Sequence, residues 1–189
     1  MTGPIKLAVL LGSNREGRMS PRVARWFVEQ AEARGDVKVD VLDVAELKLP
    51  EALDGRAPAV AAARPRFADA DAFVVVTPEY NHSFPAPLKS AIDSFHQEWQ
   101  AKPVGFVSYG GMSGGLRAVE QLRQIFAELH MVSVRDNVSF HNVWGHVGED
   151  GSFPTSPDGC NQAAKTMLDQ LVWWADALRE AKRRTPYGS

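Results

Sequence analysis

Hydrophobic positions along the chain alternate between short apolar runs and longer segments with helical spacing. The runs at residues 5–11 and 72–77 are apolar almost throughout, as in central strands that are buried on both faces. In residues 37–42, valines alternate with mostly polar residues, which predicts a more exposed strand. With two further runs, the pattern predicts five strands, at residues 5–11, 37–42, 72–77, 104–109 and 131–134.

Segments of helical spacing lie between and after these strands. Ser20 and Pro21 are expected to provide an N-cap and a proline at the first position of a helix. Four apolar residues form the stripe that this helix should bury: Val23, Trp26, Phe27 and Ala31. Similar spacing predicts helices within residues 88–95, 116–129 and 164–178. Residues 47–67 are rich in alanine, proline and arginine, and we expect a loop and one short helix there.

Alternation of strands and helices is typical of a parallel sheet covered on both faces by right-handed crossovers. At 189 residues, the chain is expected to form one domain over residues 1–189. The most common doubly wound arrangement of this size has strand order 2-1-3-4-5. The predicted fold is therefore an α/β, flavodoxin-like three-layer sandwich with a five-stranded parallel sheet.

Composition narrows the range of partners. Twenty-one basic and 23 acidic residues give a formal net charge of −2, which indicates neither a nucleic-acid nor a membrane partner. No apolar run approaches the roughly 20 residues that a membrane-spanning helix requires, and the N-terminal stretch is too short for a secretory signal. Cys160 is the single cysteine, which fits the reducing cytoplasm.

Three loops of unusual composition follow the first, third and fourth predicted strands, at residues 12–20, 77–85 and 108–115. In a parallel sheet these strand-to-helix loops lie at the carboxyl edge, where ligands bind. The order 2-1-3-4-5 makes the three strands neighbours. The loops are therefore expected to surround one ligand.

The first loop reads GSNREGRMS and approaches two known phosphate-binding patterns without matching either. Arg18 and Met19 occupy the places of the lysine and hydroxyl of a nucleoside-triphosphate loop, and Asn14 replaces the second glycine of a dinucleotide loop. A site for a single terminal phosphate remains, with backbone N–H groups and a helix N-terminus as donors. The side chains that can contribute are Ser13, Arg15, Arg18 and Ser20. The alternative is that the arginines are solvated and the serines only cap.

The other two loops suit a flat ligand. Pro78 stiffens the second loop, so that the groups of Glu79, Tyr80 and Asn81 can face a ligand in a fixed order. Tyr80 is expected either to wall the ligand or to contact a partner chain; the alternative is an ordinary turn. The third loop begins at Ser108 and has four glycines, which indicates close approach to a ligand, positive φ values or a flexible connection.

The segments GSNREGRMSPRVARW, TPEYNHSFPAPLKSAIDSF and SYGGMSGGLRAVEQLRQIF resemble the NADPH-dependent FMN reductase family. The resemblance runs from residue 5 to about 180, and residues 136–160 follow no family pattern. It implies that Ser13, Arg15, Ser20 and additionally Arg18 hold the FMN phosphate. It also implies that Pro78, Glu79, Tyr80 and Asn81 line the isoalloxazine, while the loop from Ser108 meets its pyrimidine end through N–H groups of Gly110 and Gly111.

The resemblance implies an enzyme that transfers a hydride from NADPH or NADH through FMN to a small acceptor. Free flavin, a quinone, an azo compound or a metal oxyanion are the acceptors considered. No catalytic side chain is assigned, because the cofactor supplies the chemistry, and no metal is assigned to His141 and His146. Two alternatives stay open: a flavodoxin-type electron carrier, and a non-flavin nucleotide-binding protein. Trp173 is expected to project from the last helix, and we expect a homodimer or homotetramer.

Overall fold

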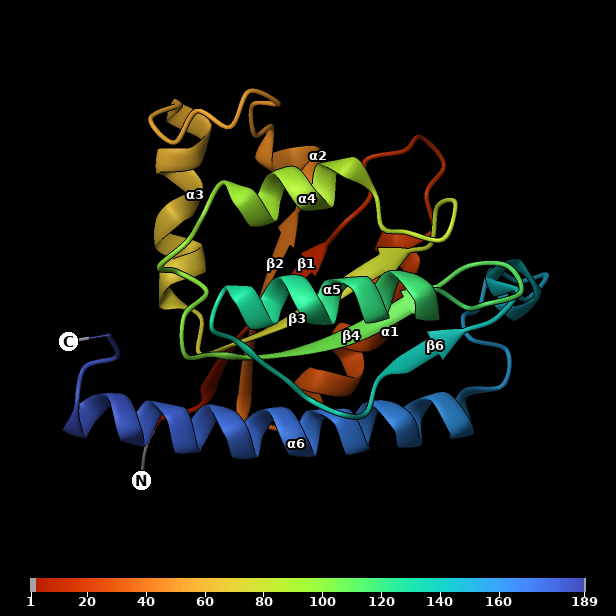
Figure 1. Cartoon of the computed structure of the whole chain (residues 1–189). Helices are drawn as coiled ribbons and strands as arrows, with labels where there is room; N and C mark the ends of the chain where they lie inside the picture. The colour runs from red at the N-terminus through yellow and green to blue at the C-terminus, as the bar shows by residue number, and fades with distance from the viewer. Residues whose placement is uncertain (1–2, 189) are drawn as a thin grey trace.

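Six parallel strands form one sheet in the computed structural model, which describes residues 3–188 (Figure 1). They are β1 (Ile5–Leu11), β2 (Val37–Asp43), β3 (Ala72–Pro78), β4 (Pro103–Tyr109), β5 (Val132–Ser133) and β6 (Val138–Phe140). Their order is β2-β1-β3-β4-β5, and β6 also pairs with β4. This order confirms the predicted flavodoxin-like α/β fold.

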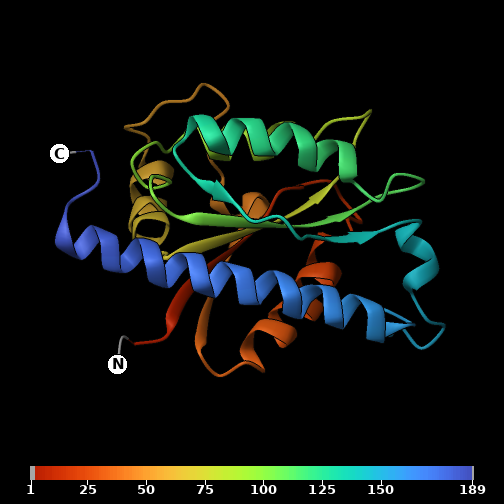
Figure 2. The same ribbon diagram turned by 60° about the horizontal axis from the view of Figure 1, so that its bottom comes forward.

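Helices cover both faces of the sheet (Figures 1 and 2). One face carries α1 (Ser20–Glu32) and α6 (Pro157–Arg184). The opposite face carries α3 (Pro58–Asp69), α4 (Ala86–Asp93) and α5 (Leu116–Glu128), with the single turn α2 (Val44–Leu47) beside them. Each face therefore has its own hydrophobic core.

The central strand β3 shows how the sequence builds both cores. Its side chains alternate between the two faces: Val74 and Val76 pack under α1 and α6, whereas Phe73 and Val75 pack under the other helices. All four are fully buried. Burial of each such side chain contributes about 1.5–3 kcal/mol, which explains why the run is apolar throughout.

Residues 47–67 differ from the expectation of a loop with one short helix. Helix α3 has 12 residues and extends to Asp69, with Pro65 inside it. Phe67 from this helix stacks on Phe95 at 4.0 Å between ring centroids, and Trp99 packs edge-on against it at 5.2 Å. Tertiary packing of this kind stabilises a helix despite its internal proline.

The fifth strand also differs from the expectation. Its regular pairing with β4 covers Val132 and Ser133 alone, not residues 131–134. Strand β6 pairs with the later part of β4, from Val107 to Tyr109. The sequence pattern of residues 136–160 gave no indication of this strand, since three residues are too few to show a periodicity.

Among residues 3–188, no helix combines the length and apolarity needed to cross a bilayer.

Candidate functional site

The three predicted loops meet at the carboxyl edge of the sheet, on the right-hand side of Figure 1. Ser13 Oγ in the first loop lies 2.9 Å from the hydroxyl of Tyr80 in the second. Ser20 Oγ, at the end of the first loop, lies 2.6 Å from the hydroxyl of Tyr109 in the third. Both serines are fully buried. The first loop is thus joined to each of the others by a pair of hydroxyl groups.

The first loop offers a set of unused hydrogen-bond donors. The backbone N–H groups of Glu16, Gly17 and Met19, and the side chain of Arg15, have no partner within residues 3–188. These donors precede the N-terminus of the 13-residue helix α1, which favours negative charge. The arrangement has the chemistry of an anion site.

Ser20 does not cap this helix, so the predicted N-cap is wrong. Helix α1 begins at Ser20, and Met19 occupies the N-cap position without a side-chain hydrogen bond. The Ser20 hydroxyl instead turns toward Tyr109. Burial raises the pKa of Tyr109 above its ordinary value, and the hydrogen bond to Ser20 only partly opposes this effect. Tyr109 is therefore neutral throughout the physiological pH range.

Arg18 is engaged with the protein itself. Its Nη1 and Nη2 atoms each donate to one carboxylate oxygen of Asp43 at 2.6 Å, and Nη1 also donates to the carbonyl oxygen of Ser13. Asp43 is the last residue of β2, and it also accepts the N–H of Ala45 at 3.0 Å. The positive charge of Arg18 is thus balanced within the fold.

The second loop contains a tight hairpin after the final residue of β3, Pro78. Tyr80 and Ser83 exchange two backbone hydrogen bonds of 2.8 and 3.0 Å. Between them, Asn81 and His82 have φ angles of 49° and 67°, as in a type I′ turn. Asparagine tolerates this left-handed conformation better than most residues. The turn therefore gives a structural reason for asparagine at position 81.

A side chain of helix α5 fixes the hairpin in place. Ser83 Oγ donates to Gln121 Oε1 at 2.6 Å, and Gln121 Nε2 donates to the carbonyl oxygen of His82 at 2.9 Å. The second loop is therefore held by α5 as well as by Ser13.

Glu79 connects the second loop to the third. Its carboxylate accepts the Arg117 N–H at 3.1 Å and the Arg117 guanidinium at 2.8 Å. Burial alone would raise the pKa of Glu79, but hydrogen bonds from Ser113 and Arg117 outweigh it and lower the pKa below its ordinary value. The side chain is 7% exposed and ionised. It acts as a tie between loops.

In the third loop, part of the glycine content has a structural cause. Gly114 and Gly115 have φ angles of 61° and 89°. A Cβ atom at Gly115 would lie 2.6 Å from the Cβ of Ser108, so a larger residue does not fit. Ser108 is fully buried and donates to the carbonyl oxygen of Gly114 at 2.8 Å.

The expectation for Gly110 and Gly111 is corrected at one position. Gly110 N–H donates to the carbonyl oxygen of Phe140 at 3.2 Å, so it is not available to a ligand. Gly111 N–H has no acceptor within residues 3–188. The carbonyl groups of Gly111 and Gly110 accept N–H groups from Asn142 and Val143, respectively. One glycine therefore offers the predicted donor, and the other joins the loop to β6.

The sequence interpretation did not identify Asp43 and Tyr109 as parts of this site. Both lie at the carboxyl ends of strands, and that position was the signal that could have found them. His141 and His146 contact backbone carbonyls, with ring nitrogens 2.7 Å from Met112 O and 3.1 Å from His141 O.

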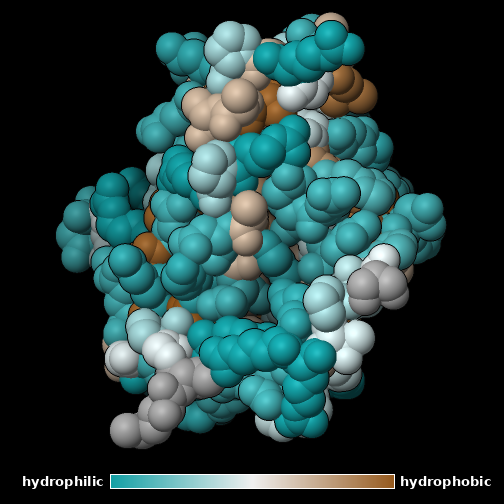
Figure 3. Space-filling model, turned by 90° about the vertical axis from the view of Figure 1, so that its left-hand side faces the viewer, coloured by the Kyte–Doolittle hydropathy of each residue, from teal (hydrophilic) through white to brown (hydrophobic). Residues whose placement is uncertain are grey.

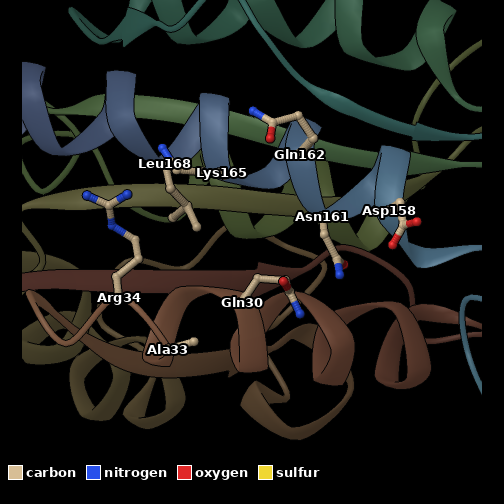
Figure 4. A pocket seen from close by; sticks show the side chains of 8 residues that line it. All are labelled: Gln30, Ala33, Arg34, Asp158, Asn161, Gln162, Lys165 and Leu168. Carbon is tan, nitrogen blue, oxygen red and sulfur yellow. The ribbon is translucent and has the colours of Figure 1, made fainter.

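Two cavities lie beside the first loop or beside helix α1, which follows it. One, of about 660 Å³, includes Asn14 and lies against α2 and α4. The other, of about 600 Å³, lies between α1 and α6 and is lined mostly by polar side chains (Figure 4). The second cavity contains no residue of the three loops. The first cavity is therefore the one of the two that adjoins the candidate site.

Comparison with known proteins identifies the family. The model of the NADPH-dependent FMN reductase family matches residues 5–145. The chain belongs to this family. Among similar proteins, an NAD(P)H-dependent FMN reductase of Saccharomyces cerevisiae is 34% identical over 146 residues, which cover 67% of this reductase and 76% of the yeast chain.

An FMN-dependent NADPH-azoreductase of Staphylococcus haemolyticus is 28% identical over 180 residues, which cover 89% of this reductase and 94% of that protein. The solved structure of the apo form of the NADH:FMN oxidoreductase EMOB has a TM-score of 0.72 at 20% identity, covering 88% of this reductase and 90% of EMOB. At this identity the structural likeness shows the fold alone.

Family membership confirms the predicted enzyme class, an FMN-dependent NAD(P)H oxidoreductase, and its cofactors FMN and NAD(P)H. The assignment of individual residues to FMN stays a prediction.

Proposed function

We propose that this reductase holds FMN at the carboxyl edge of its sheet and transfers a hydride from NAD(P)H to a small acceptor, foremost a quinone. The observation that carries the proposal is the convergence of the three loops through the Ser13–Tyr80 and Ser20–Tyr109 hydroxyl pairs. Free flavin, azo compounds and metal oxyanions are further acceptors. The name of a 33% identical Burkholderia relative, 2-hydroxy-1,4-benzoquinone reductase, supports the quinone class.

The donor set of the first loop fits the phosphate of FMN. Arg15 supplies a positive charge, and the unpaired N–H groups of the loop supply directed donors. In each hydroxyl pair, one hydrogen forms the internal bond and the second stays free. Ser13 and Ser20 can therefore donate to the phosphate while they accept from Tyr80 and Tyr109.

The second and third loops fit the ring. Pro78 and the hairpin hold the backbone of the second loop in a fixed shape, while Gly111 offers an N–H group to the pyrimidine end. Glu79 joins the second loop to α5 through Arg117, and Ser108 closes the third loop through the carbonyl oxygen of Gly114. Rigid donors of this kind stabilise negative charge without reorganisation during the reaction.

When bound, FMN supplies the ring that accepts the hydride and passes it on. The chain's own residues bind and orient, and none is assigned as a general acid or base. We infer that the nicotinamide and the acceptor use the same ring face in turn, which gives ping-pong kinetics. Steady-state rates that require a ternary complex would contradict this inference.

An absorbance spectrum of the purified protein tests the proposal. A yellow protein that NADPH bleaches under anaerobic conditions, and that a quinone then reoxidises, is the expected result. A colourless protein that gains no flavin spectrum during titration with FMN would favour a different nucleotide ligand. A yellow protein that NADPH reduces negligibly without a separate reductase would favour an electron carrier.

We also infer a homodimer or homotetramer in the cytoplasm. Trp173 on α6 is 63% exposed and packs edge-on against Trp174, with ring centroids 5.0 Å apart. A large exposed aromatic often marks a contact surface. Light scattering in dilute solution should give a multiple of the chain mass, and Trp173→Glu should lower it. Fractionation of the source cells tests the location, which the single cysteine supports.

A further inference from the structure

Arg18 was expected to bind the FMN phosphate, but its contacts point to another role. We propose that Arg18 is a positioning residue: through Asp43 it holds loop 12–20 in its anion-binding shape, and it does not contact the phosphate. This inference rests on the proposed function, because it concerns the same FMN site.

The contacts of Arg18 form a closed unit inside the protein. Its guanidinium binds both carboxylate oxygens of Asp43 at 2.6 Å, and the two side chains are 15% and 8% exposed. Both hydrogens of Nη1 are used, one by Asp43 and the other by the carbonyl oxygen of Ser13. A bidentate pair with little exposure fixes the orientation of both partners.

The bond to Ser13 explains how the pair shapes the loop. It fixes the peptide group that follows Ser13, while the backbone N–H of Arg18 donates to the carbonyl oxygen of Arg15 at 3.2 Å. Arg18 therefore ties the loop at two of its carbonyl groups, those of Ser13 and Arg15. The intervening N–H groups of Glu16 and Gly17 have no acceptor within residues 3–188.

Arg18 and Arg15 differ in whether their positive charge is neutralised by the protein. Asp43 neutralises Arg18, and the pair gives little net attraction for an anion. Arg15 is exposed and has no ion pair within residues 3–188. Arg15 is thus the cation left for the phosphate, and Arg18 maintains the loop that presents it.

The substitution Asp43→Asn distinguishes the two roles by the sign of its effect. If Arg18 positions the loop, loss of the bidentate pair weakens FMN binding. If Arg18 contacts the phosphate, loss of the competing carboxylate strengthens FMN binding. Binding is measured by quenching of flavin fluorescence with the full-length, flavin-free protein.

Glu29→Gln is the matched control for removal of one negative charge. Glu29 lies on α1 outside the loop, is exposed, and its side chain has no hydrogen bond or ion pair within residues 3–188. We expect Asp43→Asn to raise the FMN Kd by at least about tenfold relative to Glu29→Gln, which corresponds to about 1.4 kcal/mol. Equal or tighter binding by Asp43→Asn would overturn the proposal.

A second variant keeps the test valid if Asp43→Asn does not fold. The double variant Arg18→Met with Asp43→Leu removes the ion pair without changing the net charge. It should weaken FMN binding without changing its salt dependence, because no phosphate contact is lost, whereas Arg15→Met should reduce that dependence. A reduced salt dependence in the double variant would overturn the proposal. If the unmodified protein fails to bind FMN, the proposed function itself fails; if it binds FMN and only the variants behave oppositely, this inference alone fails.

Discussion

The two edges of the sheet both bury polar groups, but they use them differently. At the amino edge, Lys102 is 6% exposed and donates to the carbonyl oxygens of Phe67 and Ala68, each at 2.9 Å. It lines a cavity of about 660 Å³ on a face that is mostly hydrophilic (Figure 3). At the carboxyl edge, Ser13 and Ser20 are fully buried and bonded to tyrosine hydroxyls.

The two edges differ in the hydrogen-bond donors that the protein does not use itself. The ammonium group of Lys102 satisfies carbonyls at the end of α3, which have no partner inside the helix. Its role is structural. A pair of hydroxyl groups has two hydrogens and uses one, so each pair at the carboxyl edge keeps a donor for a ligand. Burial of polar groups alone therefore does not mark a functional site, whereas unused donors do.

The largest loss of stability should come from Gly115→Ala, in the third loop at the carboxyl edge. A new Cβ would lie 2.6 Å from Ser108 Cβ and 2.9 Å from the backbone nitrogen of Tyr109, at a φ of 89°. Overlap and backbone strain together should cost about 2–4 kcal/mol and lower the Tm by roughly 5–15 °C. FMN binding should fall as well.

Gly145→Ala is the control for this variant, because no atom lies within 4 Å of its added Cβ and its φ is not positive. Its Tm should stay near that of the unmodified protein. Calorimetry that finds the two variants equally stable would contradict the proposed packing of the third loop.

Lys102 at the amino edge should make the free energy of unfolding depend on pH in the alkaline range. Burial, together with the nearby Lys182, lowers the pKa of Lys102 from 10.5 to about 8. Between these values the unfolded chain binds more protons than the folded one, so the free energy of unfolding should rise with pH, by up to about 3 kcal/mol. Below about pH 8, the cost of burying the charge is present in full.

Chemical denaturation between pH 8 and 10.5 measures this rise. Lys102→Met should remove most of it, while Lys182→Met should keep a clear rise. A slope in Lys102→Met that equals that of the unmodified protein would show that other groups cause the alkaline effect.

A smaller effect is expected from Tyr109→Phe at the carboxyl edge. The variant removes the hydroxyl that is hydrogen-bonded to Ser20, worth about 1 kcal/mol, and should raise the FMN Kd roughly fivefold. Riboflavin, which lacks the phosphate, should bind as before. Tyr187→Phe at the amino edge removes a comparable hydrogen bond, to His130 at 2.9 Å, and should leave the FMN Kd unchanged. If both variants raised the FMN Kd equally, the two edges would not differ in their role in FMN binding.

The smallest effect is expected from Lys89→Met, in the first turn of α4. Lys89 forms an exposed ion pair with Asp93, one helical turn away, at 2.6 Å. Such pairs contribute about 0.5 kcal/mol or less. The Tm and the FMN Kd should both stay nearly constant. A marked loss of FMN affinity would place Lys89 at the phosphate instead.

Much of the candidate site was predictable because its residues stand directly after apolar strands. The positions of Ser13, Pro78 and Ser108 followed from the ends of three runs, since parallel strands align their carboxyl ends. The contacts of Ser20, Arg18 and Gly110 were not predictable in this way, because each has a partner distant in the sequence. The Ser20 hydroxyl is bonded to Tyr109, the Arg18 guanidinium to Asp43, and the Gly110 N–H to Phe140.

By itself, the sequence determined the strands, most of the helices, their order and the three loops, because apolar periodicity and the placement of glycine and proline act locally. Only the tertiary structure decided which polar groups are paired and which stay available. Ser20 and Tyr109 are 89 residues apart. A hydrogen bond between them depends on distances of a few tenths of an ångström, which the packing of whole strands and helices sets.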